Sequence, residues 1–323
     1  MRKHWIFLGL FSLFASLVAC EEDEQPSAVN PNTELIDRLQ AEVPDTLFLE
    51  ALAEVDWLAE FSADEGTIYI PDDAAFREFM SDHGADSIPM LKDILGKTLF
   101  NQILSSHFIE NQLAFEQVVP SYVRTMAKNQ AGDAIHAYLW RQGSEMKING
   151  EPVLFHQSNL EVDRFTVHRI NRILSPATLR TLITANNQRL SVFSQALSHA
   201  QAFGVILNQP EEMFSLFLPE DAAIDAFLID HNEISIEELV QAIGQNKFEE
   251  LLSGHVTPGY YLHAGMSNAT YPNLIPNQNL ELRLEPEGLI IYNAFGYSAR
   301  LLQTDIIALN GNLSIIDKVL RVP

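Results

Sequence analysis

The chain has 323 residues, of which 47% are hydrophobic and 20% are charged. This composition is typical of a globular protein with about two domains, and it excludes disordered, collagen-like and coiled-coil chains. Forty-three acidic residues against 20 basic ones give a net charge of −23, which would repel a nucleic-acid backbone and excludes nucleic acid as a partner. Because only the N-terminal segment is apolar enough to enter a bilayer, a protein with several membrane spans is also excluded.

Residues 1–19 have the features of a secretory signal peptide. A basic leader, residues 1–4, precedes the apolar residues 5–18, a run too short to span a bilayer comfortably. The run ends in Leu17-Val18-Ala19-Cys20, which resembles the lipobox of bacterial lipoproteins, where the cysteine is acylated through its thiol. Cys20 is the only cysteine of the chain. We therefore expect a lipoprotein signal peptide over 1–19 and attachment to the membrane through acylated Cys20; the alternative is an ordinary signal peptide with a chance cysteine.

Residues 20–32 are predicted to form an acidic tether. The run Glu21-Glu22-Asp23-Glu24 repels itself into an extended conformation, and Pro26 and Pro31 continue the linker. The run also resembles the acidic export signal of surface lipoproteins in Bacteroidetes. That resemblance implies a cell-envelope protein, an outer membrane lipoprotein exposed at the cell surface; a solvated spacer is the alternative.

The first half of the remaining chain is predicted to have helices early and strands late. Residues 34–61 carry apolar side chains at helical spacing, interrupted at Pro44. Ile68-Tyr69-Ile70 is a short strand that ends at Pro71, after which Asp72 or Asp73 caps a helix. Residues 91–108 are a further helix, and residues 167–174 are a closing strand.

The second half repeats this order. Helices are predicted over 192–207 and 236–255, and strands over 216–218, 280–284 and 313–320. The block Thr67–Phe76 recurs 148 positions later as Ser215–Ile224, and the same offset relates His107 to His255. We therefore predict an α+β fold with two homologous domains, 33–178 and 187–323, joined by a linker at 179–186.

These blocks resemble the fasciclin-type domain, a module of about 140 residues that often occurs in tandem. The resemblance covers 33–323 and rests on a strand–proline–acidic block, a helix ending in His, and a closing strand with an Asp. Ser106 and Gly254 depart from it, because the family usually has Tyr before the His. The resemblance implies small β-sandwiches, each packed with several helices, and a role in adhesion. The matching positions are Pro71, Asp73, Phe76, His107, Pro219, Asp221, His255 and Asp317.

No catalytic or metal site is predicted. The pairs Asp72-Asp73 and Glu220-Asp221 are adjacent in sequence, so they do not converge on one substrate atom, and a helix start after Pro favours capping carboxylates. His107 and His255 are expected to be buried and hydrogen-bonded. The sequence has no His-Glu-x-x-His motif, no phosphate loop and no nucleophile elbow, so we expect neither an enzyme nor a cofactor.

An aromatic stretch over 260–277 is the candidate for partner binding. Tyr260, Tyr261 and Tyr271 lie among Asn and Pro residues, and loop aromatics can anchor a protein or stack on sugars. The alternative is that these rings pack on their own domain.

Two functions remain open. The first is a lipid-anchored, non-enzymatic protein that mediates adhesion or matrix interaction, with a protein or polysaccharide of the matrix or cell surface as partner. The second is a glycan-binding accessory lipoprotein of a surface polysaccharide-uptake system.

Overall fold

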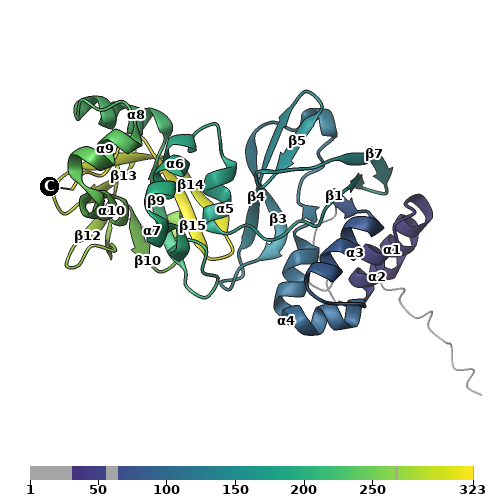
Figure 1. The fold of residues 1–323 in the computed structure, drawn as a ribbon. Helices are drawn as coiled ribbons and strands as arrows, with labels where there is room; N and C mark the ends of the chain where they lie inside the picture. Colours follow the sequence, from purple (N-terminus) through teal and green to yellow (C-terminus); the bar gives the residue numbers. More distant parts are fainter. Residues whose placement is uncertain (1–30, 56–64, 266–267, 323) are drawn as a thin grey trace, which may run out of the picture.

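The computed structural model describes residues 31–55, 65–265 and 268–322. Cys20, the signal peptide and nearly all of the acidic tether lie outside the described residues. Figure 1 shows two α+β domains that follow one another, which confirms the predicted fold class. Within the described part of the chain, no helix combines the length and apolar character needed to cross a membrane.

The first domain places its helices before most of its strands. Its helices are α1 (Pro31–Glu42), α2 (Leu47–Ala53), α3 (Asp73–Asp82) and α4 (Ile88–Ser105). Its strands are β1 (Gly66–Pro71), β2 (Phe108–Ile109), β3 (Ser121–Lys128), β4 (Ala134–Gln142), β5 (Glu145–Ile148), β6 (Glu151–Pro152), β7 (Phe155–Val162) and β8 (Phe165–Ile170). They form one sheet in the order β6-β5-β4-β3-β2-β1-β8-β7.

The second domain has the same order of helices and strands near its parallel pair, but the strands at the edge of its sheet are arranged differently. Its helices are α5 (Leu179–Ala185), α6 (Ser191–His199), α7 (Gln201–Ile206), α8 (Asp221–Asp230), α9 (Ile236–Ile243) and α10 (Gln245–Ser253). Its strands are β9 (Phe214–Pro219), β10 (Val256–Pro258), β11 (Ala269–Pro272), β12 (Asn279–Glu285), β13 (Gly288–Asn293), β14 (Ser298–Ala308) and β15 (Gly311–Ile316). The sheet order is β10-β9-β15-β14-β13-β12-β11.

Each domain is centred on one parallel pair of strands. β1 pairs in parallel with β8, and β9 pairs in parallel with β15. All six residues of β1 and all six of β9 are buried. Because side chains alternate across a strand, Ile68 and Ile70 face the helices while Tyr69 enters the opposite cluster. Leu216 and Leu218 likewise face the helices, and the side chains on both faces are covered.

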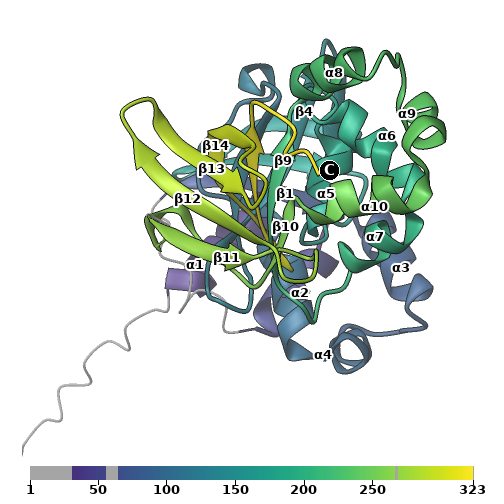
Figure 2. The ribbon, with the colours of Figure 1, turned by 90° about the vertical axis from the view of Figure 1, so that its left-hand side faces the viewer.

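The outer strands of each sheet cover the face of the parallel pair that the helices leave open. In the first domain, Leu139 and Ile148 from β4 and β5 join Tyr69 in one apolar cluster, so the sheet folds back on itself. In the second domain, β12 and β13 bring Leu282 and Ile291 against Phe217. Figure 2 shows the helices of the second domain on one side of its sheet and these strands on the other. The expected small β-sandwich, packed with helices, is thus confirmed.

Most of the residues expected to be a linker, 179–186, lie in helix α5 (Leu179–Ala185), with Asn186 as its C-cap. Leu179, Leu182 and Ile183 follow helical spacing and are fully buried in the core of the second domain. Thr178 caps the helix, because its side chain accepts a hydrogen bond from the amide of Thr181. The segment therefore belongs to the second domain, and the chain crosses between domains before it.

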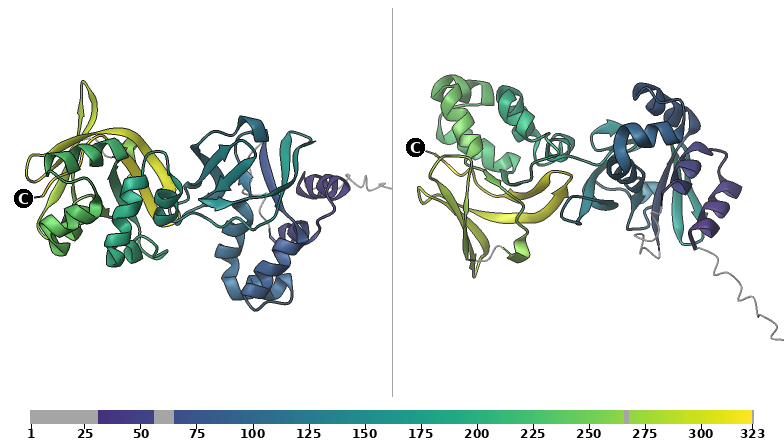
Figure 3. Two further views of the ribbon diagram at one scale, coloured as in Figure 1. Left: turned by 45° about the horizontal axis from the view of Figure 1, so that its top comes forward. Right: turned by 90° about the horizontal axis from the view of Figure 1, so that it is seen from below.

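The two domains are docked against each other. β4 lies beside β14 and α5 in Figure 1, and the views of Figure 3 show the same arrangement. Nδ1 of His136 accepts the backbone N–H of Ile307 at 3.0 Å. The Tyr122 hydroxyl donates to the carbonyl of Leu182 at 3.1 Å, and its ring packs against the core of the second domain.

Gly150 lies at this domain contact. Its φ is +86°, and an added Cβ would lie 3.4 Å from the Cα of Ala185 in α5. The left-handed backbone conformation favours glycine at this turn, while the distance to Ala185 is that of an ordinary van der Waals contact. His136 is suited to its role because burial, with a contribution from Arg124, lowers its pKa to about 4. The imidazole is therefore neutral at pH 7, and Nδ1 can accept a hydrogen bond.

We predict that His136→Leu lowers the free energy of unfolding by about 1–3 kcal/mol, because the buried N–H of Ile307 loses its acceptor. His136→Asn, which retains an acceptor near the position of Nδ1, is the matched control and is expected to lose less than half as much. Urea unfolding at pH 7 measures both values. A Leu variant as stable as the wild type would contradict the prediction.

Candidate functional site

His255 ties the end of a helix to the closing segment of its domain. The side chain is 1% exposed. Its Nδ1–H donates to the carbonyl of Leu251 at 2.8 Å, and its Nε2 accepts the N–H of Leu320 at 3.0 Å. Both ring nitrogens are therefore occupied by the backbone, which leaves neither for a substrate or a metal ion.

His107 makes the equivalent contacts in the first domain, where it bonds the carbonyl of Ile103 and the N–H of Leu174, each at 2.9 Å. Burial lowers the pKa of His107 and of His255 to about 4. Each imidazole is thus neutral at pH 7, in the tautomer that donates from Nδ1.

The adjacent carboxylates serve different helices. Asp72 caps α3, because its side chain accepts the N–H of Ala75 at 2.7 Å. Oδ1 of Asp73 instead accepts the N–H groups of Thr46 and Leu47, at 2.9 and 3.0 Å, and so binds the start of α2. The pair therefore does not address a common atom.

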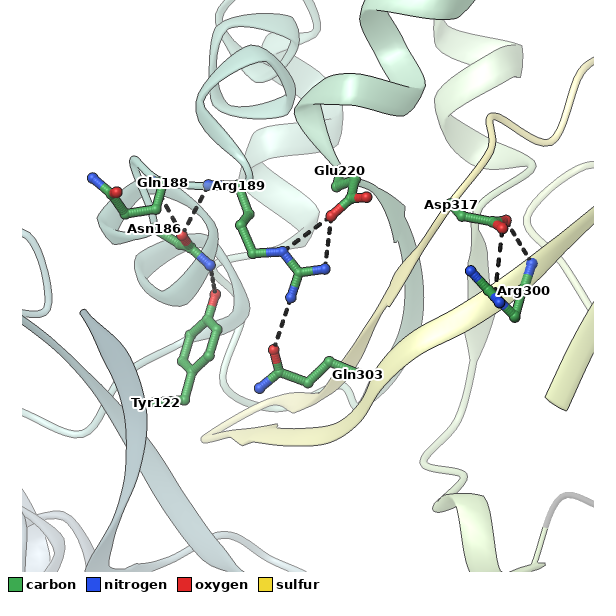
Figure 4. Close-up of polar contacts among 8 residues, drawn as sticks. All are labelled: Tyr122, Asn186, Gln188, Arg189, Glu220, Arg300, Gln303 and Asp317. Atoms are coloured by element: carbon green, nitrogen blue, oxygen red, sulfur yellow. Dashed lines mark hydrogen bonds and ion pairs between the residues drawn. The ribbon is translucent and has the colours of Figure 1, made fainter. Parts of the chain in front are cut away.

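In the second domain Asp221 has the role of Asp73. Its carboxylate accepts the N–H groups of Ser191 and Val192, at 3.1 and 2.8 Å, at the start of α6. Glu220 makes no capping bond and is paired with Arg189 (Figure 4). Asp72, Asp73 and Asp221 therefore cap helices as expected, although Asp73 and Asp221 cap a helix other than their own, and Glu220 does not cap one.

The remaining positions that match the fasciclin-type pattern are part of the strands, the core and a surface ion pair. Pro71 and Pro219 are the last residues of β1 and β9, and Phe76 is buried in the helical cluster of the first domain. Asp317 accepts the N–H of Arg300 at 2.7 Å, and its carboxylate lies 3.6 Å from Nε of the same residue (Figure 4).

The three tyrosines of the aromatic stretch are engaged inside the protein. Tyr271 is buried, and the ring of Tyr261 packs on it with centroids 4.6 Å apart. The Tyr260 hydroxyl donates to Oδ2 of Asp133, in the first domain, at 2.8 Å. Two of the rings therefore fill the sandwich of the second domain, and the third contributes to domain docking.

A groove recurs at the same place in both domains, beside the helix that follows the first buried strand. The groove of the second domain has a volume of about 600 Å³ and is lined by Phe227 and Asp230 of α8 together with Asp317 and Tyr297. The groove of the first domain has a volume of about 420 Å³ and includes Phe79. Ligands bind preferentially in concave sites of this size.

Sequence analysis did not single out Tyr297. The available signal was the hairpin Asn293-Ala294-Phe295-Gly296-Tyr297, in which Asn and Gly indicate a turn and two aromatics flank the Gly. Nothing in the local sequence distinguished the rings of Phe295 and Tyr297 from the tyrosine rings at 260–271, which pack inside the protein. Among the described residues, no group of three or more His, Cys, Asp or Glu side chains is placed to hold a metal ion.

We predict that His255 makes stability depend on pH in the acidic range. Because its pKa is about 4 when folded and 6.5 when unfolded, stability falls as pH decreases from about 6.5 towards 4. The loss approaches about 1.4 kcal/mol per pH unit. The stability gap between the wild type and His255→Gln should therefore narrow on acidification in urea unfolding experiments.

His263→Gln is the control for replacing a histidine by glutamine, since His263 is exposed and its substitution should leave the free energy of unfolding at pH 7 close to that of the wild type. A gap between the wild type and His255→Gln that stays constant from pH 7 to pH 4.5 would refute the prediction.

Comparison with known proteins identifies the fold. The fasciclin domain family matches residues 45–176 and again residues 188–323. Among solved structures, the chain is similar to a FAS1 domain pair from the insect cell adhesion molecule fasciclin I, with 17% sequence identity and a TM-score of 0.51. The alignment covers 85% of this chain and 96% of that chain. A search of curated proteins found no match. The chain therefore belongs to the fasciclin domain family and carries two such domains in tandem.

Proposed function

We propose that the protein is a lipid-anchored component of the cell envelope whose two fasciclin domains mediate adhesion or matrix interaction. The observation that carries this proposal is the tandem pair itself, since fasciclin domains are associated with adhesion and the structural neighbour is a cell adhesion molecule.

The proposed role is non-enzymatic. Fasciclin domains are typically non-catalytic, and the contacts of the candidate residues agree with that role. Both ring nitrogens of His107 and His255 are bound by the backbone, and the carboxylates of Asp73 and Asp221 cap helices. These groups are therefore used to hold the fold together.

The anchor and the location are part of the proposal. Leu17-Val18-Ala19-Cys20 supports acylation at Cys20, and the acidic residues behind it support display on the outer face of the outer membrane. Several acyl chains on one residue give stable anchoring, because each buried CH₂ contributes about 0.8 kcal/mol.

A second candidate function is a glycan-binding accessory lipoprotein of a surface polysaccharide-uptake system. The observation that favours it is the groove of the second domain, where an exposed tyrosine ring lies beside carboxylates. Such a lining suits sugars, which combine apolar ring faces with hydroxyl groups.

We predict that the wild-type protein on intact cells is cleaved by added protease and labelled by antibody. Cys20→Ser should move most of the protein from the cell-bound fraction to the medium or the periplasm, because the thioether cannot form. Ser27→Ala, in the tether, is the matched control and should behave as the wild type. Protection of the wild type from protease would contradict surface display.

We further predict that cells producing the wild-type protein attach to matrix better than cells producing Cys20→Ser. Treating the matrix with protease or with periodate identifies the partner class, since the first removes proteins and the second oxidises sugars. Equal attachment by both strains would argue against adhesion.

A further inference from the structure

The turn between β13 and β14 is held rigid by one side chain. Asn293 is 9% exposed, and its Oδ1 accepts the N–H groups of Phe295 and Tyr297 at 3.1 and 3.0 Å. Its Nδ2 donates to the carbonyl of Arg321 at 2.7 Å, which ties the turn to the C-terminal segment. Gly296, with φ of +82°, lets the backbone reverse between the two aromatics. The turn is therefore a fixed support for its rings.

Tyr297 presents an accessible ring at this groove. The residue is 43% exposed and lines the groove with Phe227. The Arg321 guanidinium lies 6.0 Å from the centroid of Tyr297 and 5.4 Å from that of Phe227, and it is paired with Asp230. These contacts orient the ring at the groove, which reduces the conformational entropy lost when a ligand stacks on it.

The carboxylates of the groove are also held in place. Both bonds from Arg189 to Glu220 go to Oε2, at 3.1 and 2.7 Å, and Arg189 also donates to Gln303 (Figure 4). Across the described part of the chain, Oε1 of Glu220 has no hydrogen-bond partner. Asp317, a second acidic lining residue, is paired with Arg300. The groove therefore offers oriented acceptors next to an aromatic ring.

The first domain provides an internal comparison. Its groove contains Phe79 and Asp82 where the second has Phe227 and Asp230, but Pro152 is part of its lining in place of an aromatic turn. The two grooves share their floor, and only the groove of the second domain has an exposed ring among its lining residues.

We propose that the groove of the second domain binds neutral sugar units of a polysaccharide. The ring of Tyr297 stacks against the apolar face of a sugar, and Glu220 and Asp317 accept hydrogen bonds from its hydroxyl groups. The net charge of −23 disfavours anionic sugars, and the three carboxylates of the groove are each paired with an arginine, which offsets their attraction for cations. This inference rests on the proposed function, because it makes the matrix partner a polysaccharide.

The test measures binding of the purified protein to neutral hexasaccharides of glucose, mannose and xylose, and to a galacturonic acid hexasaccharide, by isothermal calorimetry. We expect one of the neutral probes to bind, with little change in affinity between 50 and 500 mM NaCl. Tyr297→Ala should weaken that binding about tenfold or more. Tyr297→Phe, which keeps the ring, should stay within about threefold of the wild type.

Trp140→Ala is the matched control, because this partly exposed aromatic lies on β4 of the first domain and lines neither groove. Thermal melting checks that each variant is folded. Binding to none of the neutral probes, binding to the acidic probe alone, or equal affinity of Tyr297→Ala and the wild type would overturn the inference. If attachment of cells to matrix persists in any of these cases, the proposed function stands with a protein partner.

Discussion

Each domain depends on a pair of parallel strands whose apolar side chains must be shielded from water on both faces of the sheet. β1 and β9 carry six buried residues each, so helices must cover one face and the outer strands must fold over the other. A strand buried on both faces loses much more apolar exposure than one buried on a single face. The helices, the β-sandwich and the closing segment can all be understood as covers for this pair.

Equivalent polar contacts hold the helices and the closing segment in place in both domains. His107 and His255 each join the end of a helix to the closing segment, and Asp73 and Asp221 each bind the start of an earlier helix, α2 and α6 respectively. In each domain these bonds lie next to its buried core, where a change would leave buried backbone groups without partners. The domains differ farther out, at the edge strands and at the hairpin that carries Tyr297.

The parts of the fold that were predicted are those encoded locally. Apolar runs such as Ile68-Tyr69-Ile70 indicated the buried strands, and the repeat placed a second copy 148 residues later. Partners far apart in sequence were beyond local patterns: Asp73 binds residues 26 and 27 positions away, and the Tyr260 hydroxyl reaches Asp133, 127 positions away. Helix α5 was taken for a linker because its seven residues give too short a pattern. Whether a tyrosine packs in the core, as Tyr271 does, or is exposed, as Tyr297 is, cannot be read from periodicity when the residue lies in a loop or turn.

The docking of the two domains has a mechanical consequence. α1 and the C-terminus lie at opposite ends of the molecule, so a pull applied between them must cross the contact of β4 with β14 and α5. That contact is held by a few side-chain hydrogen bonds, including those of Tyr122 and His136, whereas each sheet is a continuous ladder. Under tension the contact between the domains is expected to open first, after which residues 171–178 alone connect the two domains. The domain pair would then lengthen and absorb load while both β-sandwiches stay folded.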